Sequence, residues 1–89
     1  MKTPTVHLNG SSGERLLEEN KTAAVAVRQA IEAVAAAAPN ARDYYVQGDA
    51  AYEQARSEHV ARLKALDTVL AELTEIRCAV REQLDQRRR

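Results

Sequence analysis

The tetrapeptide Arg42-Asp43-Tyr44-Tyr45 combines the side chains of this sequence best suited to hold a small ligand. An arginine guanidinium can donate two parallel hydrogen bonds to a phosphate or a carboxylate. Tyrosine rings can stack on a flat ligand, and their hydroxyls can form hydrogen bonds. A predicted helix begins shortly afterwards, and its first backbone N–H groups attract anions. Arg42, Asp43, Tyr44 and Tyr45 are therefore candidates for binding a nucleotide-like or other anionic ligand.

A structural role explains the same four residues. Tyr44 and Tyr45 could cover the apolar end of a helical bundle, and Arg42 could pair with Asp43 or Asp49. The sequence leaves both explanations open.

A second candidate anion site lies in the turn-forming segment 9–13, where two glycines and two serines precede a predicted helix. The candidate ligand-binding residues of this site are Asn9, Ser11 and Ser12, together with His7, which lies just before the segment. The alternative is helix capping, because Ser11 and Glu14 have the spacing of a capping box and Ser12 could equally be the cap. The acidic residues that follow also disfavour an anion at this place.

No pattern in the sequence predicts catalysis, a metal site or a cofactor. The two histidines, His7 and His59, are far apart, and no cysteine or carboxylate accompanies either at metal-ligand spacing. Cys78 is the single cysteine, which excludes a disulfide framework. A buried polar residue that fixes helix register is the simpler interpretation of His59. We therefore expect a protein that is not an enzyme.

The composition limits the chain further. It has 89 residues, 13 Lys and Arg, 13 Asp and Glu, a formal net charge of +0, and no Phe or Trp. The balanced charge argues against electrostatic binding of nucleic acid, although the C-terminal arginines could contact phosphates instead of only complementing a helix dipole. No apolar run is long enough to span a bilayer. These properties predict a cytoplasmic protein with no membrane partner.

Two long helices must position the candidate residues. Good helix formers without Gly or Pro predict one helix over residues 13–38, which Pro39 ends. After a loop at 39–48, Asp49 is a plausible N-cap for a second helix to about residue 86. Residues 1–12 are an irregular arm and 87–89 a basic tail. The expected fold is all-α, an antiparallel two-helix hairpin.

The second helix carries a sustained heptad repeat, typical of a coiled coil. If Ala38 pairs with Asp49, Glu14 falls near Leu73, and the C-terminal end of the second helix is left bare. Either the arm, through Val6 and Leu8, or a second protomer could cover that end. Because a lone hairpin buries little surface, we expect a homo-oligomeric bundle, with a dimer as the simplest form. The predicted interface residues are Tyr52, His59, Leu66, Leu73, Ile76, Val80 and Leu84.

Three strings together resemble a group of small helical proteins of phages and prophages. They are Val6-His7-Leu8-Asn9-Gly10-Ser11, Pro39-Asn40-Ala41-Arg42-Asp43-Tyr44-Tyr45 and Glu58-His59-Val60-Ala61-Arg62. The resemblance implies a phage origin, a place in the host cytoplasm and no catalytic residues. Phages use such proteins as virion parts, as inhibitors of host factors and as oligomeric sponges for nucleotide immune signals.

The leading hypothesis is a non-enzymatic oligomeric protein that sequesters a nucleotide-like or other anionic ligand and so antagonises host defence. The alternative is a virion component or a protein-interaction element that binds a host or virion protein. It would act through the exposed apolar stripe of the second helix.

Overall fold

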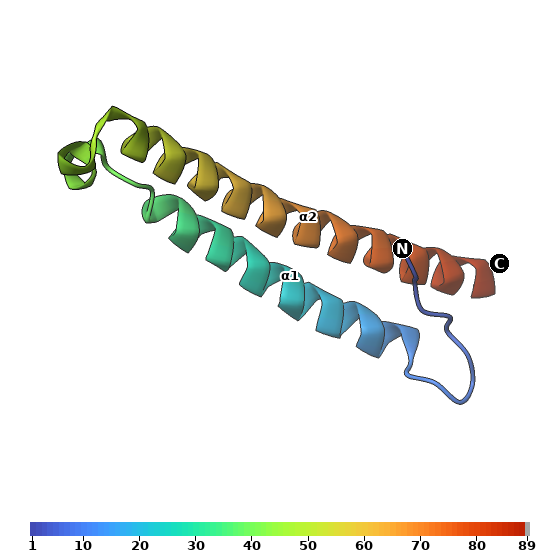
Figure 1. Cartoon of the computed structure of the whole chain (residues 1–89). Helices are drawn as coiled ribbons and strands as arrows, with labels where there is room; N and C mark the ends of the chain where they lie inside the picture. The colour runs from blue at the N-terminus through green and yellow to red at the C-terminus, as the bar shows by residue number, and fades with distance from the viewer. Residues whose placement is uncertain (89) are drawn as a thin grey trace.

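The chain folds into two long antiparallel helices, as the sequence predicts (Figure 1). A computed structural model describes residues 1–88. Helix α1 spans Gly13–Ala36 and helix α2 spans Asp49–Arg87, and two short 3-10 turns, η1 (Ala41–Asp43) and η2 (Tyr45–Gln47), connect them. The molecule is a rod of 63 × 21 × 20 Å, and these dimensions include the arm of residues 1–12. The predicted basic tail ends on Arg89, which lies outside the described residues.

The ends of α1 follow local signals. Ser12 is the N-cap, because its backbone is extended and its hydroxyl accepts a hydrogen bond from the backbone N–H of Arg15 at 3.1 Å. The alternative cap with Ser11 is therefore not used. At the other end α1 stops at Ala36 instead of residue 38, since Pro39 disfavours helical backbone in the residue before it.

The start of α2 corrects the prediction for Asp49. The N-cap is Gly48, and Asp49 is the first residue of the helix, where its carboxylate complements the helix dipole. Gly48 has a φ of 107°, a conformation that residues with a Cβ rarely adopt. The loop therefore spans residues 37–48, and Gly48 turns it into α2.

The register of the two helices also differs from the prediction. The Asn20 side-chain amide donates a hydrogen bond to the carbonyl of Leu73 at 2.9 Å, so Asn20 occupies the place that was expected for Glu14. Similarly, Gly13 lies directly against the side chain of Leu84. The physical cause is the loop, which carries the chain past the end of α1. The unmatched turns of α2 consequently lie at its beginning rather than at its C-terminal end.

The arm covers the C-terminal end of α2, one of the two possibilities the sequence left open. Val6 is 6% exposed and forms the core with Val80 and Leu84, and two leucines of α1 pack against this core. Leu8, the other expected contact, is 97% exposed. Val80 and Leu84, which the predicted register left uncovered by α1, are therefore covered within the single chain by Val6 and by leucines of α1.

The heptad stripe of α2 packs chiefly inside the chain. His59, Val80 and Leu84 are buried without any second copy. The other residues of the predicted interface are half-buried: Tyr52, Leu66, Leu73 and Ile76. Within residues 1–88, neither helix has a stretch long and apolar enough to cross a membrane.

Candidate functional site

A pocket of about 310 Å³ lies at the loop end of the rod, where the end of α1, the loop and the first turns of α2 meet. We call it the loop-end pocket. Its lining residues are Ala37, Pro39, Tyr44, Gln47, Ala51, Gln54, Ala55, Glu58, His59 and Arg62. The α2 members recur at three- and four-residue spacing, which places them on one face of that helix. The pocket exists because α2 begins beyond the end of α1.

The loop is held over this pocket by local hydrogen bonds and by one aromatic contact. The Asn40 side chain accepts a hydrogen bond from the backbone N–H of Arg42 at 3.1 Å, which caps η1. The Tyr44 ring packs on Tyr52 of α2, with ring centroids 6.5 Å apart and ring planes tilted by 50°. Tyr44 is half-buried as a result, and it forms an aromatic wall of the pocket.

His59 is the chemically unusual member of the pocket. It is 7% exposed, and its Nε2 atom is shielded from solvent and has no hydrogen-bond partner in the described part of the chain. A buried polar atom without a partner costs about 1–3 kcal/mol. A neutral imidazole nitrogen can donate or accept depending on its tautomer. Because Nε2 is not accessible from the pocket, a ligand group could form the missing hydrogen bond only after the ring rotates toward the pocket.

Arg62 supplies a positive charge at the exposed side of the pocket. Glu58 and Arg62, and likewise Arg28 and Glu32, have the i, i+4 spacing at which ion pairs form on a helix face. Within residues 1–88 the only ion pair is between Arg15 and Glu19, at 3.4 Å. The Arg62 guanidinium is therefore available to an anionic ligand.

One of the four loop candidates lines the pocket. Tyr44 does, whereas Arg42 and Asp43 are exposed outside it and Tyr45 is 73% exposed. The alternative that Arg42 pairs with Asp43 or Asp49 is not realised within the described residues. These three exposed side chains remain free to contact a larger ligand or a partner.

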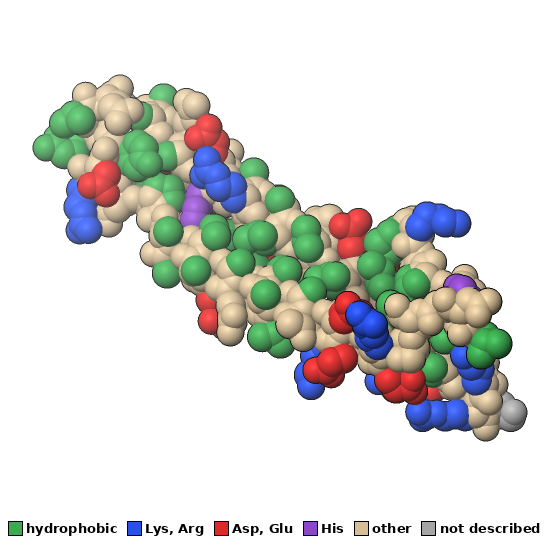
Figure 2. Space-filling view, turned by 90° about the horizontal axis from the view of Figure 1, so that it is seen from below, with side chains coloured by type: hydrophobic (Ala, Val, Ile, Leu, Met, Phe, Trp, Pro, Cys, Tyr) green, Lys and Arg blue, Asp and Glu red, His purple; other side chains and the backbone are tan. Residues whose placement is uncertain are grey.

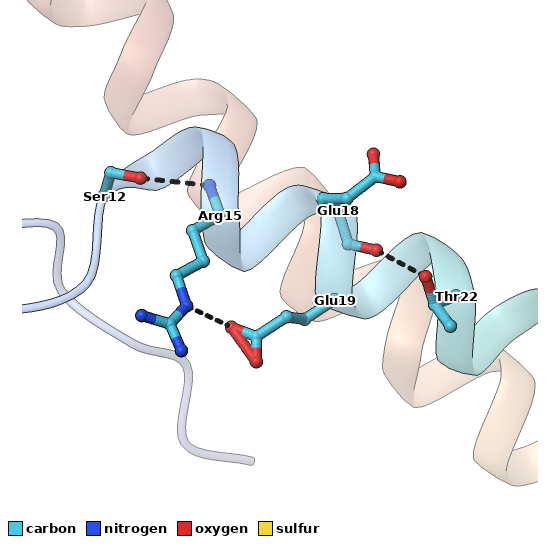
Figure 3. A network of polar contacts seen from close by, with 5 residues as sticks. All are labelled: Ser12, Arg15, Glu18, Glu19 and Thr22. Atoms are coloured by element: carbon cyan, nitrogen blue, oxygen red, sulfur yellow. Dashed lines mark hydrogen bonds and ion pairs between the residues drawn. The ribbon is translucent and has the colours of Figure 1, made fainter.

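The arm candidates lie at the opposite end of the rod from the loop (Figure 1). The backbone N–H of Gly10 donates to the carbonyl of His7 and closes the turn that contains Asn9. Ser12 is used as the helix cap, and the Arg15–Glu19 ion pair lies beside it (Figure 3). Within one chain the arm and the loop therefore cannot line one site.

The sequence interpretation missed Gln47, Gln54, Glu58 and Arg62 as pocket residues. A signal was present for Arg62, because it occupies a heptad position that Ala55, Val69 and Ile76 fill elsewhere with apolar side chains. A charged residue in an apolar row can mark a place where the row faces a polar cavity.

A second, shallower depression of about 540 Å³ lies near the arm end. Its residues are Glu14, Leu17, Glu18, Lys21, Arg28, Arg77 and Arg81. Arg77 already donates hydrogen bonds to Asn20 at 3.3 Å and to Thr74 at 3.5 Å. Among residues 1–88, no three His, Cys, Asp or Glu side chains converge as metal ligands. The loop-end pocket is therefore the stronger candidate site.

No protein-family model matches the chain, and no curated protein or solved structure matches it either.

Proposed function

We propose that this chain is a non-enzymatic, self-associating protein that binds a small anionic, nucleotide-like ligand in the loop-end pocket. The observation that carries the proposal is His59, a buried imidazole with an unpartnered Nε2 in the wall of a polar pocket. Unsatisfied buried polar atoms are rare in proteins, so each calls for an explanation, and the explanation we propose here is a bound ligand.

The other pocket residues suit the same ligand class. Tyr44 offers an aromatic face, Gln47 and Gln54 offer amide groups that can both donate and accept, and Arg62 offers positive charge. A volume of about 310 Å³ lies at the lower end of the range for small-molecule sites. These groups can bind and orient a ligand.

The resemblance to small phage and prophage proteins supports a role in sequestering a nucleotide signal of host defence, in the host cytoplasm. Sequestration requires tight binding and no turnover of the ligand, and both are properties that we propose for this pocket.

Isothermal titration calorimetry with linear and cyclic nucleotides, and with inorganic phosphate, tests the proposal. We expect binding of at least one nucleotide, a loss of about 10-fold or more in affinity for Arg62→Ala, and a similar loss for His59→Leu. Arg56→Ala is the matched control, because Arg56 is an exposed arginine of α2 that does not line the pocket. Absence of binding, or equal affinity of Arg62→Ala and Arg56→Ala, would overturn the proposal.

A second candidate function is a structural or protein-interaction role, in a virion or on a host factor. The observation in its favour is Val69, a large aliphatic side chain in the middle of α2 that is 42% exposed. If this role is correct, Val69→Glu prevents assembly into virions or capture of the host factor, and Arg62→Ala does not.

A further inference from the structure

The chain exposes more surface than a compact protein of its mass. Its accessible surface is 6714 Å², whereas the scaling for folded monomers gives about 5,200 Å² for a chain of 9.8 kDa. The excess is about 1,500 Å², compared with about 800 Å² that each partner buries in a standard protein interface. The monomer therefore has enough surplus surface for an extensive contact.

The surplus lies in the middle of the hairpin. Along residues 60–79 of α2, all of which the structure describes, no side chain is buried, and the same is true of residues 25–36 of α1. Leu63, Leu66 and Leu70 are only half-buried in this region. The core is confined to the arm end, where Val6 covers Val80 and Leu84.

One side of the hairpin is nearly free of charge in this middle region, and we call it the alanine face. Its residues recur at three- and four-residue spacing: Ala23, Ala26, Ala30 and Ala33 of α1, Ala37 directly after it, and Ala65, Val69, Glu72, Ile76 and Ala79 of α2, of which the exposed Glu72 is the one charged member. Ala37 shares the loop-end pocket with Ala55 and Arg62, which continue the α2 series, so the two series lie on the same side.

The other side of the hairpin is charged. There the shallow depression joins Lys21 and Arg28 of α1 to Arg77 and Arg81 of α2. A space-filling view shows hydrophobic side chains along the middle of the rod and charged side chains gathered nearer its margins and one end (Figure 2). The small residues are therefore gathered on one side, although Val25 and Val60 are exposed on the charged side.

We propose that a second copy of the chain packs antiparallel against the alanine face, giving a four-helix dimer. Alanines let helix backbones approach closely, so this face suits another helix pair better than bulky or irregular partners. The charges at the two ends of the hairpin determine the relative direction of the two copies. Residues 40–62 at the loop end contain four carboxylates and three arginines, whereas residues 77–88 contain four arginines and two carboxylates. An antiparallel pair places the acidic end of one copy beside the basic end of the other.

The same arrangement affects the ligand site, and this step alone rests on the proposed function. The loop-end pocket is lined by residues of the alanine-face series, so the second copy lies next to it. In the antiparallel pair, the arm end of that copy reaches the same end of the bundle. His7 and Asn9 of the arm are thereby brought toward Tyr44 and the exposed Arg42, which one chain alone keeps apart.

Sedimentation equilibrium of the ligand-free protein tests the assembly. We expect the mass of a dimer at micromolar concentration and the mass of a monomer for Val69→Glu. Val46→Glu is the control, because Val46 is a 76% exposed valine in the connecting loop. Circular dichroism shows that each variant remains helical, and Ala26→Leu gives a second variant that crowds the face without adding charge. A monomeric wild type, or a dimeric Val69→Glu, would overturn the proposal.

The direction of packing is tested with nitroxide labels in a Cys78→Ser background, because Cys78 is exposed and would react. Labels at Thr68, near the middle of α2, should be close in the dimer. Labels at Ala50 should be about 54 Å apart along the axis, since each lies some 18 residues from the middle at about 1.5 Å per residue. A short distance at both positions would show a parallel pair. Both measurements omit nucleotides, so a failed titration would remove the ligand proposal and leave this one standing.

Discussion

The side chain of Gln83 should decide whether the arm stays on the hairpin. Its amide is bonded to the arm twice: the backbone N–H of Val6 donates to Oε1 at 2.8 Å, and Nε2 donates to the carbonyl of Pro4 at 2.9 Å. Arg87 also donates to the carbonyl of Val6. Both backbone groups of Val6 are thus held by side chains of α2, as they would be by a neighbouring β-strand.

Replacing Gln83 by alanine removes two hydrogen bonds while leaving the Val6 side chain and Arg87 in place. Each bond contributes about 0.5–1.5 kcal/mol net, so detachment of the arm should become easier by about 1–3 kcal/mol. That range corresponds to a roughly 5- to 150-fold larger population of the detached arm. The effect should be local, because no other described residue uses this amide except the carbonyl of Ala79, one turn earlier in α2.

Amide hydrogen exchange followed by NMR measures this population directly at the N–H of Val6. We expect the protection of that amide to fall by the same factor in Gln83→Ala and to be unchanged in Gln86→Ala, an exposed neighbour on α2. Amides at the loop end should exchange equally in all three proteins. If Val6 exchanges as fast in the wild type as in an unfolded peptide, or if Gln83→Ala leaves its protection intact, the arm is not held as argued.

Three further substitutions have expected outcomes in thermal or chemical unfolding. Gly13→Ala should destabilise by about 1–3 kcal/mol although alanine favours helix, because its Cβ would overlap the side chain of Leu84; a gain in stability would contradict this packing. Val80→Ala should cost about 2 kcal/mol, since a side chain 1% exposed loses two methyl groups and leaves a cavity, whereas Val46→Ala should change stability by less than about 0.5 kcal/mol. His59→Leu should stabilise the ligand-free protein by about 1–3 kcal/mol, because it removes the unpartnered Nε2; a loss of stability would mean that Nε2 has a partner.

The helices could be predicted because their signals are local. Ser12 has the right side chain to accept the first free N–H of α1, and Pro39 prevents its continuation whatever the rest of the chain does. The heptad repeat likewise identified one face of α2, which was expected to be an oligomer interface and which packs chiefly within the chain. Such patterns depend only on residues within a turn or two of each other.

The register could not be predicted, because it depends on the path of the loop. Nothing in the residue types of 37–48 fixes two successive 3-10 turns, and the positive φ of Gly48 is permitted rather than required by glycine. Because of that path, Leu73 lies beside Asn20 and not beside Glu14 as predicted. The same shift decides which end of α2 is covered by α1. A wrong prediction of the loop path therefore gave a wrong register for the whole helix pair.

The candidate site was predicted in part for the same reason. The residue types marked Tyr44 and Tyr45 alike as candidates, but only the loop's backbone decides that Tyr44 packs on α2 and lines the pocket and that Tyr45 faces solvent. His59 was correctly expected to be a buried polar residue on an apolar face. Its missing partner could not be inferred, because it depends on the pocket that the register creates.

The two ends of the rod are stabilised in different ways, and this difference bears on where a ligand can act. At the arm end, Val6, Val80 and Leu84 form a compact core and Asn20 ties the helices together. At the loop end, the buried side chains are only Ala55 and the unpartnered His59 among the described residues. Local opening should therefore be easiest at the loop end. The proposed ligand would stabilise the part of the hairpin that has the least core of its own, because binding only the folded state favours that state. The end that is poorest in packing is thus the end best placed to respond to a ligand.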